Sequence, residues 1–83
     1  MKKKFKHFVV HFFEEDCMGQ VNENTVNIII FKTKDDSIKY KEAEIDLSEL
    51  EIHDSIYHTH YYGQDSLDQW EQGSYHFTCL RIK

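Results

Sequence analysis

Three carboxylates alternate with apolar residues between positions 42 and 46, as Glu42, Glu44 and Asp46. On an extended strand, side chains two residues apart lie about 6.6–6.8 Å apart on the same face. Phosphates follow each other about every 3.4 Å along one strand of duplex DNA, so this row would match every second phosphate. Such a row could occupy a groove that otherwise holds nucleic acid. The simpler interpretation is a solvated edge strand whose charges discourage aggregation.

The charge distribution over the rest of the chain favours the first interpretation. The net charge is −5 over 83 residues, and residues 42–80 contain nine acids and no lysine or arginine. Ordinary surfaces intersperse both signs, so solubility alone does not require this pattern. Because a field of one sign attracts basic surfaces and repels phosphate, we expect a basic protein partner, with no direct binding to nucleic acid or membrane. The nine acids are Glu42, Glu44, Asp46, Glu49, Glu51, Asp54, Asp65, Asp68 and Glu71.

A run of tyrosine and histidine at residues 57–62 follows these acids, and Trp70 comes shortly after it. Tyrosine and tryptophan combine a large apolar surface with a polar group, and they are enriched at interface hot spots. Alternation along a strand would divide the run between two faces, which cannot both be fully buried. The simpler interpretation is that the tyrosines add bulk to a small core and keep their hydroxyls at its rim. As interface anchors we expect Tyr57, Tyr61, Tyr62 and Trp70.

His58 and His60 form a His-x-His pair whose imidazoles would point the same way from a strand. A tetrahedral zinc ion needs a third protein ligand, which His53, His76 or Cys79 could supply from a neighbouring segment. No Cys-x-x-Cys or His-Glu-x-x-His motif accompanies the pair, so a polar strand face is the better interpretation. We expect no cofactor. A small histidine-dependent metal-binding protein or enzyme stays as an alternative.

Two His-x-Ser/Thr tripeptides, at 53–55 and 76–78, resemble the paired motif of two-histidine phosphoesterases. That resemblance covers six residues and implies one imidazole as base, the other as acid, and a cationic phosphate site. The chain is too short for the duplicated fold of that family, and its second half lacks cations. We therefore expect no enzymatic activity.

The elements that would position these residues are short strands. Apolar alternation and apolar runs predict strands at 4–13, 25–33 and 38–47, an extended segment at 51–62 and a final strand at 74–82. The Asp and Ser residues within 34–37 are typical of a turn, so we expect a hairpin between the second and third strands.

One short helix is expected near residues 65–72, because Ser66 and Gln69 form a capping box and Gly73 follows as a stop signal. No ten-residue helical crossover is available, so the strands should pair antiparallel. The expected fold is a single domain, residues 1–83, in the α+β class: a mostly antiparallel sheet of about five strands with this one helix. A small all-β barrel is the alternative.

Cys17 and Cys79 are too few and too distant to predict a disulfide framework, so we expect a cytoplasmic protein. In size, charge and β content the chain resembles, as a class, small acidic proteins that neutralise nucleic-acid enzymes, such as bacteriocin immunity proteins and phage anti-defence proteins. We expect a non-enzymatic inhibitor or decoy of a basic nucleic-acid-acting protein such as a nuclease. A structural or virion component that self-associates through an open sheet edge is a further alternative. The predicted partner-binding residues are Glu42, Glu44, Asp46, Glu49, Glu51, Asp54, Tyr57, Tyr61, Tyr62 and Trp70.

Overall fold

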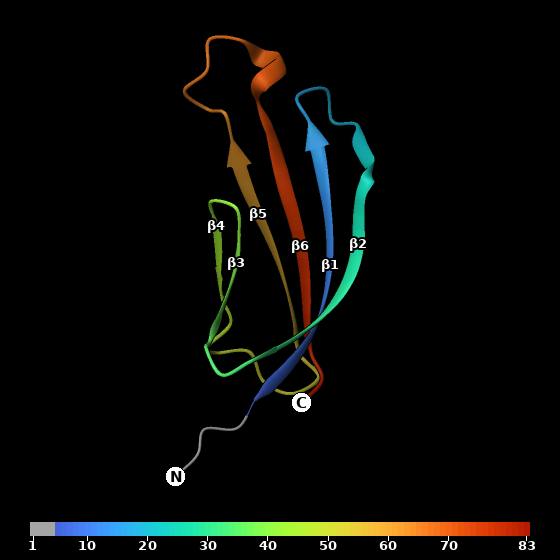
Figure 1. The fold of residues 1–83 in the computed structure, drawn as a ribbon, viewed down its shortest axis with the longest axis vertical. Helices are drawn as coiled ribbons and strands as arrows, with labels where there is room; N and C mark the ends of the chain where they lie inside the picture. The colour runs from blue at the N-terminus through green and yellow to red at the C-terminus, as the bar shows by residue number, and fades with distance from the viewer. Residues whose placement is uncertain (1–4) are drawn as a thin grey trace.

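The computed structural model describes residues 5–83, which form two antiparallel sheets (Figure 1). The larger sheet has four strands in the order β2-β1-β6-β5, and the smaller is the β3–β4 hairpin. The strands are β1 (Lys6–Asp16), β2 (Val21–Thr33), β3 (Ser37–Tyr40), β4 (Ala43–Asp46), β5 (Ser55–Tyr62) and β6 (Gly73–Arg81), and a single 3-10 turn, η1 (Gln69–Glu71), precedes β6. The molecule is elongated, with extents of 50 × 23 × 17 Å.

The core lies between the hairpin and one face of the larger sheet, called here the inner face. Alternation along β1 and β6 directs every second side chain to this face, as the burial of Phe8, Val10 and Phe12 on β1 illustrates. The two layers meet through aromatic rings, since the ring centroid of Tyr40 on the hairpin lies 4.4 Å from that of Phe12 and 5.9 Å from that of Phe77 on the larger sheet. The buried apolar residues are Phe8, Val10, Phe12, Ile38, Ala43, Ile45, Leu47, Tyr75, Phe77 and Cys79.

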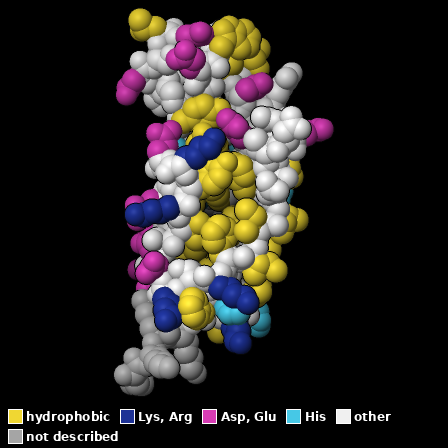
Figure 2. Space-filling view, in the orientation of Figure 1, with side chains coloured by type: hydrophobic (Ala, Val, Ile, Leu, Met, Phe, Trp, Pro, Cys, Tyr) yellow, Lys and Arg dark blue, Asp and Glu magenta, His cyan; other side chains and the backbone are white. Residues whose placement is uncertain are grey.

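The hairpin does not cover the whole inner face. A groove of about 170 Å³ remains between β2 and β3, and Phe12, Phe31 and Tyr40 are among its lining residues. Figure 2 shows the hydrophobic side chains in this hollow between the hairpin and β2. The two layers therefore form an open sandwich and do not close into the barrel that was the alternative expectation.

The opposite face of the four-stranded sheet, called here the open face, has no layer of the described chain upon it (Figure 1). Residues paired across neighbouring strands share a face, so the register defines its members. Val9 pairs with Ile30 and Leu80, and His11 pairs with Ile28 and Thr78. The central residues of the open face are Val9, His11, Phe13, Ile28, Ile30, Ser55, Tyr57, Thr59, His76, Thr78 and Leu80.

The α+β expectation is wrong, because residues 65–72 contain no α-helix and only the three-residue turn η1. Leu67 and Trp70 are both exposed, so the segment has no buried apolar side to hold a helix against the sheet. A helix this short is not stable without such packing. The Ser66 hydroxyl donates to Glu71 Oε2 at 2.6 Å, and Asp68 instead caps the turn by accepting a hydrogen bond from the Trp70 backbone N–H.

The expected third strand, 38–47, is two strands joined by a tight turn at Lys41 and Glu42. Lys41 has a positive φ of 52°, as two-residue hairpin turns require at their first position. The phase change of the apolar pattern between Tyr40 and Ala43 marks this turn. The sequence analysis predicts a single strand there, and the structure has a complete reversal of the chain.

The expected hairpin between the second and third strands is also absent. β2 pairs only with β1 among the described strands, from Lys6–Thr33 to Glu15–Val21, and β3 belongs to the other sheet. Ile38 is buried against the inner face, so the chain must leave the plane of the larger sheet after Thr33. The apolar run in β2 therefore lies on an edge strand and is largely exposed. The expected first strand is present as β1 and is central in the sheet, although Lys4, the first residue of the expected range, lies outside the described residues.

Candidate partner-binding surface

The predicted carboxylate row does not form as a straight line along one strand. Glu44 and Asp46 point outward from β4, whereas Glu42 lies in the turn that precedes the strand. Lys39 pairs directly with Glu44 across the hairpin, and Lys41 is adjacent to Glu42 in the chain. Figure 2 shows lysine side chains among the acids over the hairpin. The hairpin therefore has a mixed surface, and its acids do not create a field free of cations.

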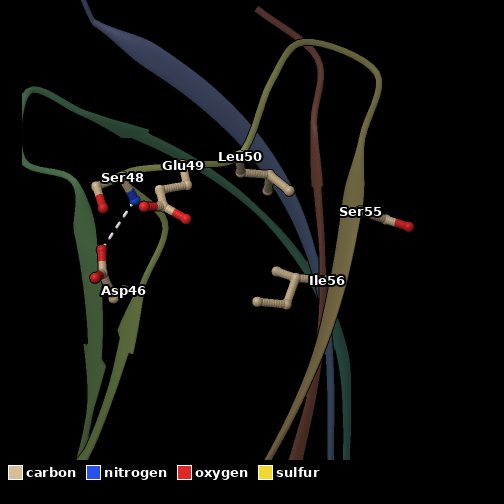
Figure 3. A pocket seen from close by; sticks show the side chains of 6 residues that line it. All are labelled: Asp46, Ser48, Glu49, Leu50, Ser55 and Ile56. Atoms are coloured by element: carbon tan, nitrogen blue, oxygen red, sulfur yellow. Dashed lines mark hydrogen bonds between the residues drawn. The ribbon is translucent and has the colours of Figure 1, made fainter.

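The remaining predicted acids of this region lie in the connection from β4 to β5. Asp46, Glu49, Leu50 and Ile56 line a shallow cleft of about 400 Å³, and Ile56 points into it (Figure 3). Asp46 Oδ1 accepts a hydrogen bond of 2.9 Å from the Ser48 backbone N–H, which lowers the pKa of the Asp46 carboxyl. Glu49, Glu51 and Asp54 are exposed. This cleft has carboxylates at its rim but no exposed aromatic residue among its lining residues.

A second group of acids gathers at one end of the molecule, where the β1–β2 turn and the β5–β6 loop lie side by side (Figure 1). The register requires this proximity, because Glu15 pairs with Ser74 and Asp16 with Gly73. Neither residues 14–31 nor residues 42–80 contain lysine or arginine, so both connections carry carboxylates alone. We call this region the acidic end; its carboxylates are Glu15, Asp16, Glu23, Asp65, Asp68 and Glu71.

Large apolar side chains are exposed at the acidic end beside these carboxylates. Trp70 is 70% exposed, Met18 is 65% exposed and Leu67 is fully exposed. Figure 2 shows hydrophobic and acidic side chains next to each other at this end. Between the two connections lies a cleft of about 430 Å³ whose lining includes Glu15, Met18 and Tyr61. Apolar groups surrounded by charges of one sign are the composition expected of a protein-binding surface.

Local hydrogen bonds hold both connections of the acidic end in shape. In the β1–β2 turn, Asp16 Oδ1 accepts from the backbone N–H groups of Met18 and Gln20, each at 2.9 Å. In the β5–β6 loop, Gly63 has a φ of 70°, and any side chain there would collide with the backbone oxygen of Glu71. Because the loops are already ordered, binding through them costs little additional conformational entropy.

The predicted aromatic anchors are distributed over three places. Trp70 and Tyr61 lie at the acidic end, and Tyr57 lies on the open face, where its hydroxyl contacts His76 Nδ1. Tyr62 is half-buried on the inner face, where its ring stacks on Tyr75 with centroids 4.6 Å apart. Its hydroxyl donates to Glu14 Oε1 at 2.5 Å, and burial together with this carboxylate raises the pKa of Tyr62. The ring and the hydroxyl of Tyr62 are therefore both engaged within the fold, unlike those of an exposed anchor such as Trp70.

The histidines considered as metal ligands or catalytic groups are separated by the sheet. His58 and His60 point to the inner side, opposite Phe77 and Tyr75, whereas His76 lies on the open face. The His53 backbone N–H donates to the Arg81 carbonyl. Arg81 lies five residues after His76, or about 16 Å further along β6, so His53 and His76 are far apart. Within residues 5–83, no three His, Cys, Asp or Glu side chains are grouped so that they could hold a metal ion.

His76 is the centre of a side-chain network on the open face that the sequence did not indicate. Its Nε2 lies 2.9 Å from Ser74 Oγ and 3.3 Å from Glu15 Oε2, and its ring stacks on Phe13 at 4.7 Å. In a catalytic triad the hydroxyl and the carboxylate occupy opposite nitrogens of the imidazole. Here they share one nitrogen, and Ser74 is only 6% exposed, so this network positions His76 and does not create a nucleophile.

The sequence also gave no indication that Glu15, Asp16 and Met18 belong with the β5–β6 loop. Roughly fifty residues separate them from that loop in the chain, and only the pairing of β1 with β6 brings them together. Comparison with protein-family models, curated proteins and solved structures finds no match for this chain, so the functional assignment rests on the surface itself. None of the described helical segments is long and apolar enough to cross a membrane.

Proposed function

We propose that this protein is a small acidic, non-enzymatic binding protein that inhibits a basic nucleic-acid-acting protein by occupying its cationic groove with the acidic end. One observation carries the proposal: six carboxylates and the exposed Met18, Leu67 and Trp70 share one end, and the two connections that form it contain no lysine or arginine. The hairpin acids that the sequence singled out are secondary in this proposal, because Lys39 and Lys41 lie among them.

The two kinds of residue at the acidic end have different roles in binding. The carboxylates attract a cationic partner over a distance, which raises the association rate and makes it dependent on salt. The apolar side chains then pack against the partner and slow dissociation, as central aromatic anchors do at interfaces. A bound nucleic acid carries the same sign of charge as this end, so the protein would exclude it from the partner's groove.

The cytoplasm is the compartment that fits this function. Both cysteines are free, and Cys79 is fully buried, as suits a reducing environment. Immunity proteins and phage anti-defence proteins are the classes with which this proposal groups the chain, on the basis of size, charge and β content.

The proposal is tested by immobilising the protein, exposing it to a bacterial lysate at low and high salt, and assaying the captured protein on nucleic acid. We expect a basic protein that is retained at low salt, is released at high salt, and loses its nucleic-acid activity when bound. The combined variant Asp65→Asn, Glu23→Gln should lower the association rate about tenfold.

The matched control also removes two negative charges, but away from the acidic end, as Glu44→Gln on the hairpin with Glu49→Gln in the connection from β4 to β5, and it should leave the association rate nearly unchanged. Trp70→Ala should raise the dissociation rate without altering the salt dependence. Capture that is insensitive to salt, or an equal effect of the two charge variants, would contradict a role for the acidic end.

A further inference from the structure

The open face has a broad central region without charged side chains. Across its three middle rows, no Asp, Glu, Lys or Arg occurs on any of the four strands. Ile28 is 72% exposed and Ile30 is 63% exposed, while Tyr57 and Leu80 continue the apolar surface across β5 and β6. The centre of this face therefore combines exposed apolar side chains with serine, threonine and histidine, and no layer of the described chain covers it. An exposed patch of this kind normally marks an interaction surface.

The dimensions of the open face suit a second sheet. Four strands about 4.8 Å apart make a width of about 19 Å, and six residue steps of about 3.3 Å, from Val9 to Glu15, make a length of about 20 Å. This footprint is on the order of 400 Å² before side-chain relief is counted, which is below the roughly 600–1,000 Å² per partner of standard interfaces and fits a weak dimer. Two such faces can pack at about 10 Å, as the layers of β-sandwiches do.

Charge at the two ends of the molecule favours one orientation of a second copy. The acidic end carries carboxylates alone, whereas the opposite end carries cations interspersed with acids. Those cations are Lys6, Lys32, Lys34, Arg81 and Lys83. On the open face itself, Lys32 pairs with His7 near the mixed end, and Glu15 lies at the opposite end of the same face, next to the acidic end. Packing that joins like ends would bring carboxylates against carboxylates, whereas the reversed packing brings Glu15 toward Lys32.

We propose that the open face packs against the open face of a second copy of this chain, with the strands of the two copies running in opposite directions. Glu15, at the border of the acidic end, then faces the row of His7 and Lys32 in the other copy. The middle row, which contains His11 and Thr78, lies at the two-fold axis, so Thr78 of one copy faces Thr78 of the other. The centre of this interface contains no Asp, Glu, Lys or Arg. Packing of the two open faces removes their exposed isoleucines, Ile28 and Ile30, from water.

Sedimentation equilibrium on the purified full chain, without any partner, tests this association. We expect a dimer, and Ile28→Asp should raise its dissociation constant at least about 100-fold, because each dimer loses two buried isoleucines and gains two buried charges. Ile52→Asp is the matched control, since Ile52 is also exposed but lies in the loop before β5. A wild-type monomer at a concentration on the order of 1 mM, or a dimer unaffected by Ile28→Asp, would overturn the proposal.

Orientation is tested by salt and by a charge reversal. Added salt should weaken the reversed dimer, and Lys32→Glu should weaken it at low salt more than at high salt. Lys39→Glu, on the outward side of the hairpin, is the matched control and should have no effect. A dimer that salt strengthens would contradict the opposite-direction arrangement, because it would indicate that like-charged ends meet.

Cross-linking gives a measurement that does not depend on a weakened variant. In a Cys17→Ser background, Thr78→Cys should form a covalent dimer with a short bis-maleimide, whereas Lys39→Cys should not. Thr78 is exposed and Lys39 is exposed, so both substitutions leave the core intact. Equal cross-linking of the two variants would overturn the proposal, and so would retention of the wild-type chain on neutral lipid vesicles with no dimer in solution.

Discussion

The inner and open faces of the larger sheet are built from alternate residues of the same strands, yet only one of them is covered. On β1, Phe8, Val10 and Phe12 are at most 4% exposed, while Val9 and Phe13 on the other side are only partly buried. Apolar residues therefore occur on both sides of β1, although His7 and His11 also lie on the open side, so the presence of apolar residues does not by itself determine which side is covered. The difference is the β3–β4 hairpin, which supplies Ile38, Ala43 and Ile45 to one side alone. An apolar strand face becomes core only where the chain can fold a second layer onto it.

The acids show a parallel contrast between the hairpin and the acidic end. Both regions come from segments rich in carboxylates, but the hairpin brings Lys39 opposite Glu44, whereas the acidic end joins two segments that contain no cation. Charge patterning along the sequence therefore predicts a local field only where neighbouring strands carry the same sign. The following predictions compare the two faces of the sheet and proceed from the largest expected effect to the smallest.

The largest difference should come from adjacent residues of β6 on opposite faces. Phe77→Ala removes a buried ring that contacts Phe12 and Tyr40, so it should lower the free energy of unfolding by about 3–5 kcal/mol. In the monomer, at a protein concentration below the dimer dissociation constant, Thr78→Ala on the open face should change it by no more than about 0.5 kcal/mol. Urea denaturation followed by far-ultraviolet circular dichroism measures both, because Trp70 is already exposed in the folded chain. Similar losses for the two variants would mean that the open face is also part of the folding core.

Neighbouring tyrosines of β5 provide a second pair. Tyr62→Phe deletes the hydroxyl that donates to Glu14 and leaves that carboxylate half-buried without this donor, so we expect a loss of about 1.5–3 kcal/mol. Tyr61→Phe changes an exposed side chain at the acidic end and should have almost no effect on stability. The same denaturation experiment applies, and an equal response of both variants would show that the Tyr62 hydroxyl is not engaged.

Alkaline pH should weaken the inner face through its buried thiol. Burial raises the pKa of Cys79 from 9.0 to about 11, so the unfolded chain loses this proton at a lower pH than the folded chain does. The contribution of the Cys79 thiol to the free energy of unfolding is therefore fully present below pH 9 and is lost as the pH rises toward 11. Cys79→Ala should flatten this decline in the free energy of unfolding, after allowance for its lower starting value. A decline of unchanged slope in the variant would assign it to other groups, such as Tyr62.

The smallest effect concerns reaction of the two thiols in the folded protein. Cys79 has no exposed surface and a raised pKa, whereas Cys17 lies in the cleft of the acidic end and is partly exposed. A thiol reagent at pH 8 should therefore modify Cys17 and leave Cys79 unmodified until the protein unfolds. Mass spectrometry of the digested protein identifies the labelled residue. Labelling of Cys79 under native conditions would show that the hairpin opens from the inner face.

Several features could be predicted from the sequence because they depend on neighbouring residues. Alternation identified β1 and β6 as strands, and the apolar run at 26–31, interrupted only by Asn27, identified β2, with strand ends displaced by a few residues. The failure at 65–72 has the opposite cause. A capping box and a stop signal are local, but a helix of this length also needs a buried side, and Leu67 and Trp70 are both exposed among the described residues.

The sequence by itself determined that the chain is strand-rich, that its strands have two apolar faces, and that its carboxylates occur in segments without cations. Tertiary structure alone decided which face is covered, that Lys39 stands opposite Glu44, and that Glu15 and Asp16 lie beside the β5–β6 loop. The physical reason is that periodicity and charge pattern act between near neighbours in the chain. Register and layer packing depend on contacts between residues tens of positions apart, and those contacts form only when the whole core assembles.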